Sequence, residues 1–224
     1  MGTENLFRKR KARQAKDLRR QRESREAYDK VLIVCEGEKT EPYYFQGLRA
    51  YYKLNTANVE VTGKCESSPK NVLDYALERY KKEDKLGDAY DQVYCVFDKD
   101  IHSTYQLTLD RIASLKYNKK KKTVIAITSV PCFEYWLLLH YEYTTKPFRA
   151  SGSESAADNI IAELRKYRTD YKKAEVGLFS KLFDKLELAK SNAERATIEA
   201  KNQNTDNPST RVHELVGYLQ NIKG

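Results

Sequence analysis

The fold of this chain can be inferred from the stretch VLIVCEGE, residues 31–38. Its first five residues are apolar and rich in β-branched side chains, a pattern typical of a strand covered on both faces of a sheet. A second stretch, QVYCVF at residues 92–97, has the same character and runs into Asp98, Lys99 and Asp100. Two buried strands are therefore predicted, and acidic residues follow each of them.

Strand and helix patterns alternate around these two stretches. Strands are predicted at residues 31–35, 59–62, 92–97 and 123–128, and helices at 40–52, 69–80 and 104–115. This alternation predicts an α/β fold with a parallel sheet and helices on both faces. The rest of the chain is predicted to be helical, at residues 132–141, 156–167, 178–189, 193–201 and from Ser209 onward. We expect a basic arm at residues 1–29, a catalytic core at 30–145, and a helical C-terminal region at 146–224 that packs on the core.

The arm carries most of the excess charge. The chain of 224 residues has 41 Lys or Arg and 32 Asp or Glu, a net charge of +9. Residues 1–30 hold 11 of these bases and 5 of these acids, which is +6. Apolar side chains are too sparse there to form a helix stripe. The arm is therefore either a solvated helix or a segment that folds on a polyanion such as nucleic acid.

Several classes of protein are excluded by composition. No apolar run approaches the roughly 18 residues of a membrane helix, and the first thirty residues lack the apolar region of a signal peptide. We expect a cytoplasmic protein with no membrane contact. The four cysteines stand alone, two of them in strand-like runs, which indicates reduced core thiols. The three histidines have no metal-ligand spacing.

The acids that follow the two buried strands predict a metal site. Ligands of a parallel sheet bind where its strands end. If the strands are neighbours, Glu36, Asp98 and Asp100 converge, and carboxylate oxygens select Mg²⁺ or Mn²⁺. A lone Asp-x-Asp after a strand is more often a cap or turn. Here Glu36 follows the other buried strand at the equivalent position, which makes a metal site more specific than either acidic motif alone. Glu134 lies in an apolar helix and either joins this site or faces solvent.

Four motifs resemble those of the RloB family, Toprim-type proteins encoded beside bacterial restriction and phage-defence loci. They are VLIVCEGEKTEPYYFQGL, VYCVFDKD, PCFEYWLLLH and NPSTRVHELV, and they span the chain in order. The resemblance implies the Toprim fold of topoisomerase, primase and OLD-family nuclease centres. It also implies that Glu36 is a general acid or base and that Asp98 and Asp100 bind metal. The Toprim pattern has an acid where Thr40 stands here, so the neighbouring Glu41 is the candidate ligand of a second metal. Val130 stands where the family tends to carry Asn.

Basic residues near these motifs are candidates for binding a substrate phosphate. They are Lys39, Lys99, Arg211 and His213. Lys99 alternatively faces solvent. Asn207, Ser209 and Thr210 are expected to form the N-cap of the last helix.

The sequence thus predicts a Mg²⁺-dependent endonuclease. The resemblance favours an enzyme that cleaves RNA, in particular tRNA, as an effector of anti-phage defence by abortive infection. It implies an RloA-like ATPase as partner, and a homo-oligomer is a further possible state. A DNA endonuclease of the OLD type and a non-catalytic nucleic-acid adaptor of the ATPase are the alternatives. Clustered carboxylates favour the enzyme over the adaptor, because they repel a polyanionic ligand and an adaptor gains nothing from them. The GEKTE string is not an ATP-binding loop, because it lacks the upstream glycine of that motif. An aspartyl phosphatase is disfavoured because its Asp-x-Asp normally follows an early strand, whereas here it follows the third strand and has a glutamate partner.

Overall fold

The structure is a computed structural model that describes residues 27–65, 67–99, 103–115 and 123–224, with isolated positions 6, 10, 13, 23 and 25. Asp100 lies outside the described residues, as do most of the predicted arm and residues 116–122.

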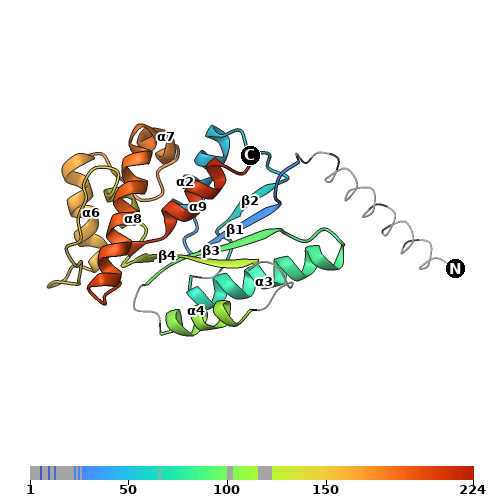
Figure 1. Cartoon of the computed structure of the whole chain (residues 1–224), viewed down its shortest axis with the longest axis horizontal. Coiled ribbons are helices and arrows are strands. Elements are labelled where there is room, and N and C mark those ends of the chain that lie inside the picture. The colour runs from blue at the N-terminus through green and yellow to red at the C-terminus, as the bar shows by residue number, and fades with distance from the viewer. Residues whose placement is uncertain are drawn as a thin grey trace.

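A five-stranded sheet of order β2-β1-β3-β4-β5 forms the centre of the molecule (Figure 1). The first four strands are parallel and β5 is antiparallel to β4. Register pairs Val34 with Cys95 and Val96 with Ile127. The stretches 31–35 and 92–97 are therefore neighbouring strands, as the metal-site prediction requires. The strands are β1 (Val31–Cys35), β2 (Val59–Thr62), β3 (Gln92–Asp98), β4 (Val124–Val130) and β5 (Ser209–Thr210).

Helices cover both faces of the sheet, which confirms the predicted α/β class. Leu32 and Val34 of β1 point to one face, against α3 (Pro69–Lys85) and α4 (Tyr105–Ser114). Val31, Ile33 and Cys35 point to the other, against α2 (Thr40–Tyr51) and the C-terminal helices (Figure 1). Each face has its own apolar core, so β1 is buried along its whole length. The four cysteines are free and buried, as expected.

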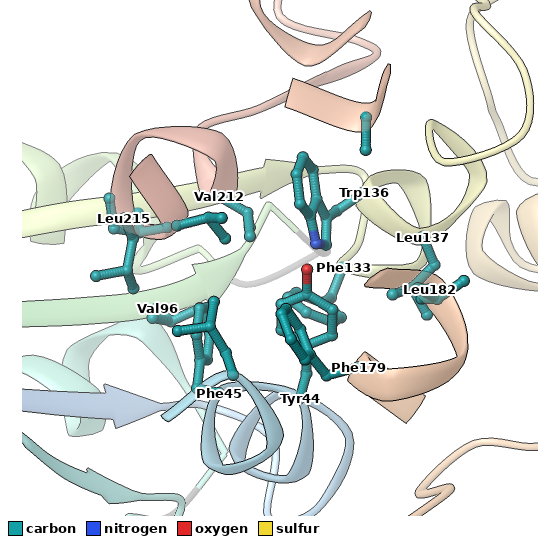
Figure 2. Packing of buried hydrophobic residues seen from close by; sticks show 14 of the residues in the cluster. Tyr44, Phe45, Val96, Phe133, Trp136, Leu137, Phe179, Leu182, Val212 and Leu215 are labelled. Carbon is teal, nitrogen blue, oxygen red and sulfur yellow. The ribbon is translucent and has the colours of Figure 1, made fainter. Parts of the chain in front are cut away.

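The C-terminal helices share the core of the α2 face. Figure 2 shows side chains of α5, α7 and α9 packed against Tyr44 and Phe45 of α2. The Phe133 ring lies 5.5 Å from that of Tyr44, and Trp136 lies 6.3 Å from it. This packing fixes the short helix α5 against α2. The helices are α5 (Glu134–Leu138), α6 (Ala156–Tyr167), α7 (Leu178–Leu182), the 3-10 turn η1 (Phe183–Lys185), α8 (Leu186–Asn202) and α9 (Val212–Gln220).

Three predictions for the C-terminal region were wrong. The helices expected at 178–189 and 193–201 are replaced by α7, η1 and a continuous α8. The helix α8 is not interrupted at Asn192, because this buried side chain donates a hydrogen bond to the Leu139 carbonyl at 2.9 Å. Ser209 does not begin a helix, because it and Thr210 pair with β4 as β5. Asn207 caps no helix either: its side chain binds both the amide and the carbonyl of Phe148, at 3.1 and 2.8 Å.

Residues 25 and 27–30, here called the arm root, are fastened to the edge of the sheet where the parallel strands begin. Lys30 is buried, and its ammonium lies 2.7 Å from Glu83 and 2.8 Å from Asp88. The guanidinium of Arg25 also pairs with Asp88. The Tyr28 hydroxyl accepts a hydrogen bond from the Asn55 amide at 2.5 Å. The arm therefore joins the body at the edge opposite Glu36 and Asp98.

Among the helices that the structure describes, none is long and apolar enough to cross a membrane.

Candidate functional site

The centre of the candidate site is a contact between the ends of β1 and β3. The Glu36 carboxylate accepts a hydrogen bond from the backbone amide of Asp98 at 3.0 Å. The Glu36 amide in turn donates to the Val96 carbonyl at 2.9 Å, which continues the ladder between the strands. Glu36 is 8% exposed. The pairing of the two strands thus holds one predicted site residue directly against another.

The entry to α5 adds a second acid. The Asp98 carboxylate accepts a hydrogen bond from the Phe133 amide at 3.1 Å, so the start of α5 is tied to the end of β3. Glu134 is the next residue and is 5% exposed. It therefore lies in the interior, on the side of the acids, and not on an exposed stripe of its helix.

Glu41 joins the group from the first turn of α2. Its carboxylate lies over Gly37: a Cβ added at Gly37 would meet Glu41 Oε2 at 2.1 Å. Gly37 is thus required for this close approach. Gly63, after β2, lies against the Gly37 carbonyl, which its own Cβ would meet at 2.3 Å. The turn that carries Glu36 is therefore held between α2 and the end of β2.

Thr40, the first residue of α2, connects this helix to a loop that is distant in the sequence. The helix begins at Thr40, and Lys39 precedes it as N-cap without a side-chain hydrogen bond. The Thr40 hydroxyl instead accepts from the Ala174 amide at 3.1 Å. This contact brings the loop between α6 and α7 to the acids.

Burial and mutual repulsion raise the pKa values of two of these acids. Burial first, and then the nearby charges of Glu134 and Glu36, raise the pKa of Glu41 from 4.5 to about 7. The pKa of Asp98 is raised well above its ordinary value by burial and by Glu41, Glu134 and Glu36. Glu36 and Glu134 are therefore close enough for their charges to oppose the ionisation of Glu41 and Asp98.

A cavity of about 160 Å³ opens beside Asp98 and Glu134. Lys173 lies at this cavity with its ammonium 3.6 Å from a Glu134 carboxylate oxygen. The Tyr171 hydroxyl donates to the same oxygen at 3.4 Å. Neither residue was identified in the sequence, because nothing in the string DYKKAE separates them from a surface loop. The full lining is Asp98, Pro131, Cys132, Glu134, Ser155, Ala156, Ala157 and Lys173.

The donor chemistry of this edge fits a hard divalent cation. Its acids are oxygen donors, and the charges of neighbouring acids add to burial in raising the pKa values of Glu41 and Asp98, a repulsion that a cation would relieve. Within the described part of the chain, no group of three or more Asp, Glu, His or Cys side chains is arranged to hold a metal ion. Asp100, the second acid of the predicted pair, lies outside that part.

The predicted phosphate contacts are mostly engaged elsewhere. Lys99 pairs with Asp206 at 2.5 Å. The Arg211 guanidinium donates to the Ala126 carbonyl at 2.9 Å and pairs with Glu214. Burial lowers the pKa of His213, which lies 3.1 Å from the Thr210 carbonyl. Lys39 is exposed in the loop between Glu36 and α2.

Comparison with known proteins gives the family. The chain matches no curated protein and no solved structure. The family model described as RloB-like protein matches residues 31–219, from the first residue of β1 almost to the end of α9. The match contains Glu36, Glu41, Asp98 and Glu134, and it begins after the arm. The chain therefore belongs to the RloB-like protein family.

Proposed function

We propose that this protein is a metal-dependent nuclease of the Toprim type that hydrolyses phosphodiester bonds of nucleic acid. The observation that carries the proposal is the gathering of Glu36, Glu41, Asp98 and Glu134 at the carboxyl edge of the parallel sheet. Such a cluster opposes folding and repels a polyanion unless a cation neutralises it. A purely nucleic-acid-binding adaptor would be weakened by it.

In this proposal Asp98 and Asp100 hold Mg²⁺ or Mn²⁺, with Glu36 and Glu41 beside them as candidates for a second ion. The bound ion supplies positive charge that lowers the pKa of water and offsets charge on the leaving oxygen. The chain's own amides orient the acids, because the amide of Asp98 fixes the Glu36 carboxylate and that of Phe133 fixes Asp98. Glu36 is then a ligand or the group that relays the proton.

RNA, in particular tRNA, is the proposed substrate. Family membership supports this choice, together with an anti-phage role in which an RloA-like ATPase restrains or releases the nuclease. A basic arm suits either RNA or DNA, so DNA cleavage is an outcome that the experiment must distinguish.

The test is an incubation of the full chain with total cellular RNA and with plasmid DNA, in Mg²⁺ and in EDTA. Glu36→Gln is the control, because the amide oxygen still accepts the hydrogen bond of Asp98 while the charge is lost. We expect RNA cleavage that needs Mg²⁺ and Glu36. Cleavage of plasmid alone would identify a DNA endonuclease. Mg²⁺-independent cleavage, or equal cleavage by the variant, would refute the proposed site.

A further inference from the structure

Lys173 is the one basic side chain among the described residues that line the cavity beside the acids. One wall of this cavity is formed by Asp98, Cys132 and Glu134, and the other by the first turn of α6. A negative substrate that approaches Asp98 through this opening therefore passes a single lysine set among carboxylates.

The backbone around Lys173 is held on both sides. Tyr171 is 2% exposed and donates its hydroxyl to Glu134, while the Ala174 amide donates to Thr40 at 3.1 Å. The Lys173 side chain itself is 58% exposed. The residue thus has a fixed place at the cavity and a side chain that is free to move in solvent.

The contact of Lys173 with Glu134 is weak and exchangeable. Its 3.6 Å separation exceeds an ordinary hydrogen bond, and it joins a lysine side chain that is 58% exposed to a carboxylate that is 6% exposed. A phosphate oxygen is an equally charged acceptor and has no protein backbone to restrain its approach. The exposed ammonium can therefore exchange the carboxylate for a phosphate, at the cost of leaving the buried Glu134 without this partner.

The geometry points to Lys173 as a catalytic residue that binds a backbone phosphate of the nucleic acid next to the bond being cleaved. In the free protein its ammonium rests on Glu134. When substrate binds, it moves to a non-bridging phosphate oxygen and leaves Glu134 to the site. No covalent bond is made or broken by the lysine. This inference rests on the proposed function and gives that site its substrate contact.

Cleavage by four proteins tests the role: the wild type, Lys173→Met, Lys173→Arg and Lys172→Met. Lys172 is the matched control, because it is an exposed lysine next to Lys173 and is not one of the described residues that line the cavity. With bulk tRNA and Mg²⁺, we expect Lys173→Met to lose about a hundredfold in turnover, as for loss of a donor to developing charge. Lys173→Arg should keep most of the activity and Lys172→Met all of it. Equal cleavage by Lys173→Met and the wild type would overturn the inference.

Binding in EDTA gives a second readout that does not depend on activity. The slope of log affinity for bulk tRNA against log salt should shrink by roughly 0.7–0.9 in Lys173→Met, the contribution of one phosphate contact, and not in Lys172→Met. An unchanged slope would overturn the inference even if the wild type proves inactive. An inactive wild type with a smaller slope in Lys173→Met would refute the nuclease and leave the phosphate contact standing. Thermal melting of each variant excludes misfolding.

Discussion

Glu36 and Asp98 lie 62 positions apart in the chain, and the Glu36 carboxylate accepts a hydrogen bond from the backbone amide of Asp98 at 3.0 Å. The contact exists only because β1 and β3 are neighbours in parallel register. It couples the fold to the site, because any change that separates these strands also separates the two acids.

Removing charge from the acids should abolish cleavage without unfolding the protein. Asp98→Asn keeps an acceptor for the Phe133 amide, and Asp100→Ala removes the second acid of the pair. We expect each to lose roughly a hundredfold or more in activity. The melting temperature of Asp98→Asn in EDTA should be unchanged or higher, because repulsion with Glu41 and Glu134 is relieved. Either variant with wild-type activity in Mg²⁺ would show that the acid concerned is not a ligand.

Gly37→Ala should act through Glu41. The new methyl group takes the place of the Glu41 carboxylate, which rotates away, so activity should fall as far as in Glu41→Ala. The double variant should be no worse than either single one, as expected for residues that act together. Additive losses would separate the two roles.

Gly63→Ala is the contrasting change, since its methyl group meets the backbone oxygen of Gly37, which cannot rotate away. It should cost about 1–3 kcal/mol in the free energy of unfolding, measured with urea. Gly217→Ala in α9 is the matched control: it meets nothing within 4 Å and should stabilise by about 0.5–1 kcal/mol. Equal effects of the two substitutions would contradict the packing at Gly63.

Asp88 should make stability depend on pH in the acid range. Burial alone would raise its pKa, but hydrogen bonds from Arg25 and Lys30 outweigh burial and lower the pKa from 3.8 to about 2. A depressed pKa stabilises the folded state above the unfolded value near 4, and this contribution disappears as the pH falls toward 2. The free energy of unfolding lost in Asp88→Asn should therefore be largest above about pH 5, on the order of 2 kcal/mol, and shrink toward pH 2. A difference that is constant with pH would contradict the assignment.

Deleting residues 1–24 should weaken binding of nucleic acid and leave turnover intact. The deletion removes nine Lys or Arg and three Asp or Glu, a loss of +6, while it keeps Arg25 for its contact with Asp88. The slope of log affinity against log salt should shrink by an amount set by how many of the deleted cations touch phosphates. Turnover at saturating substrate should survive because the acids lie at the other edge. An unchanged slope together with lost co-purification of an ATPase would instead make the arm a docking segment.

The sequence was sufficient for the four parallel strands and for the positions of Glu36 and Asp98. Runs such as VLIVC are long enough and apolar enough to leave little choice but a buried strand, and Glu36 and Asp98 follow from where those runs end. Glu41 was placed beside the site only as a candidate, because its contact depends on the absence of a side chain at Gly37. No periodicity reports that kind of contact.

The parts that sequence could not predict depend on distant partners. Ser209 and Thr210 form a strand of two residues, too short for a pattern, and only pairing with β4 defines it. Arg211 is a candidate phosphate contact by its charge, and the charge alone could not show that its guanidinium also donates to the Ala126 carbonyl. Lys173 reaches the acids because Thr40, 134 positions away from Ala174, holds its loop.

The arm root also sets a minimum footprint for any nucleic acid that the whole protein holds. The root lies where β1 begins and Glu36 where it ends, and a strand of five residues spans roughly 17 Å at about 3.3 Å per residue. A duplex covers that distance in about five base steps of 3.4 Å. Ligands shorter than this can reach the acids but not the root as well, so a contribution of the arm root to affinity would emerge only as the ligand lengthens.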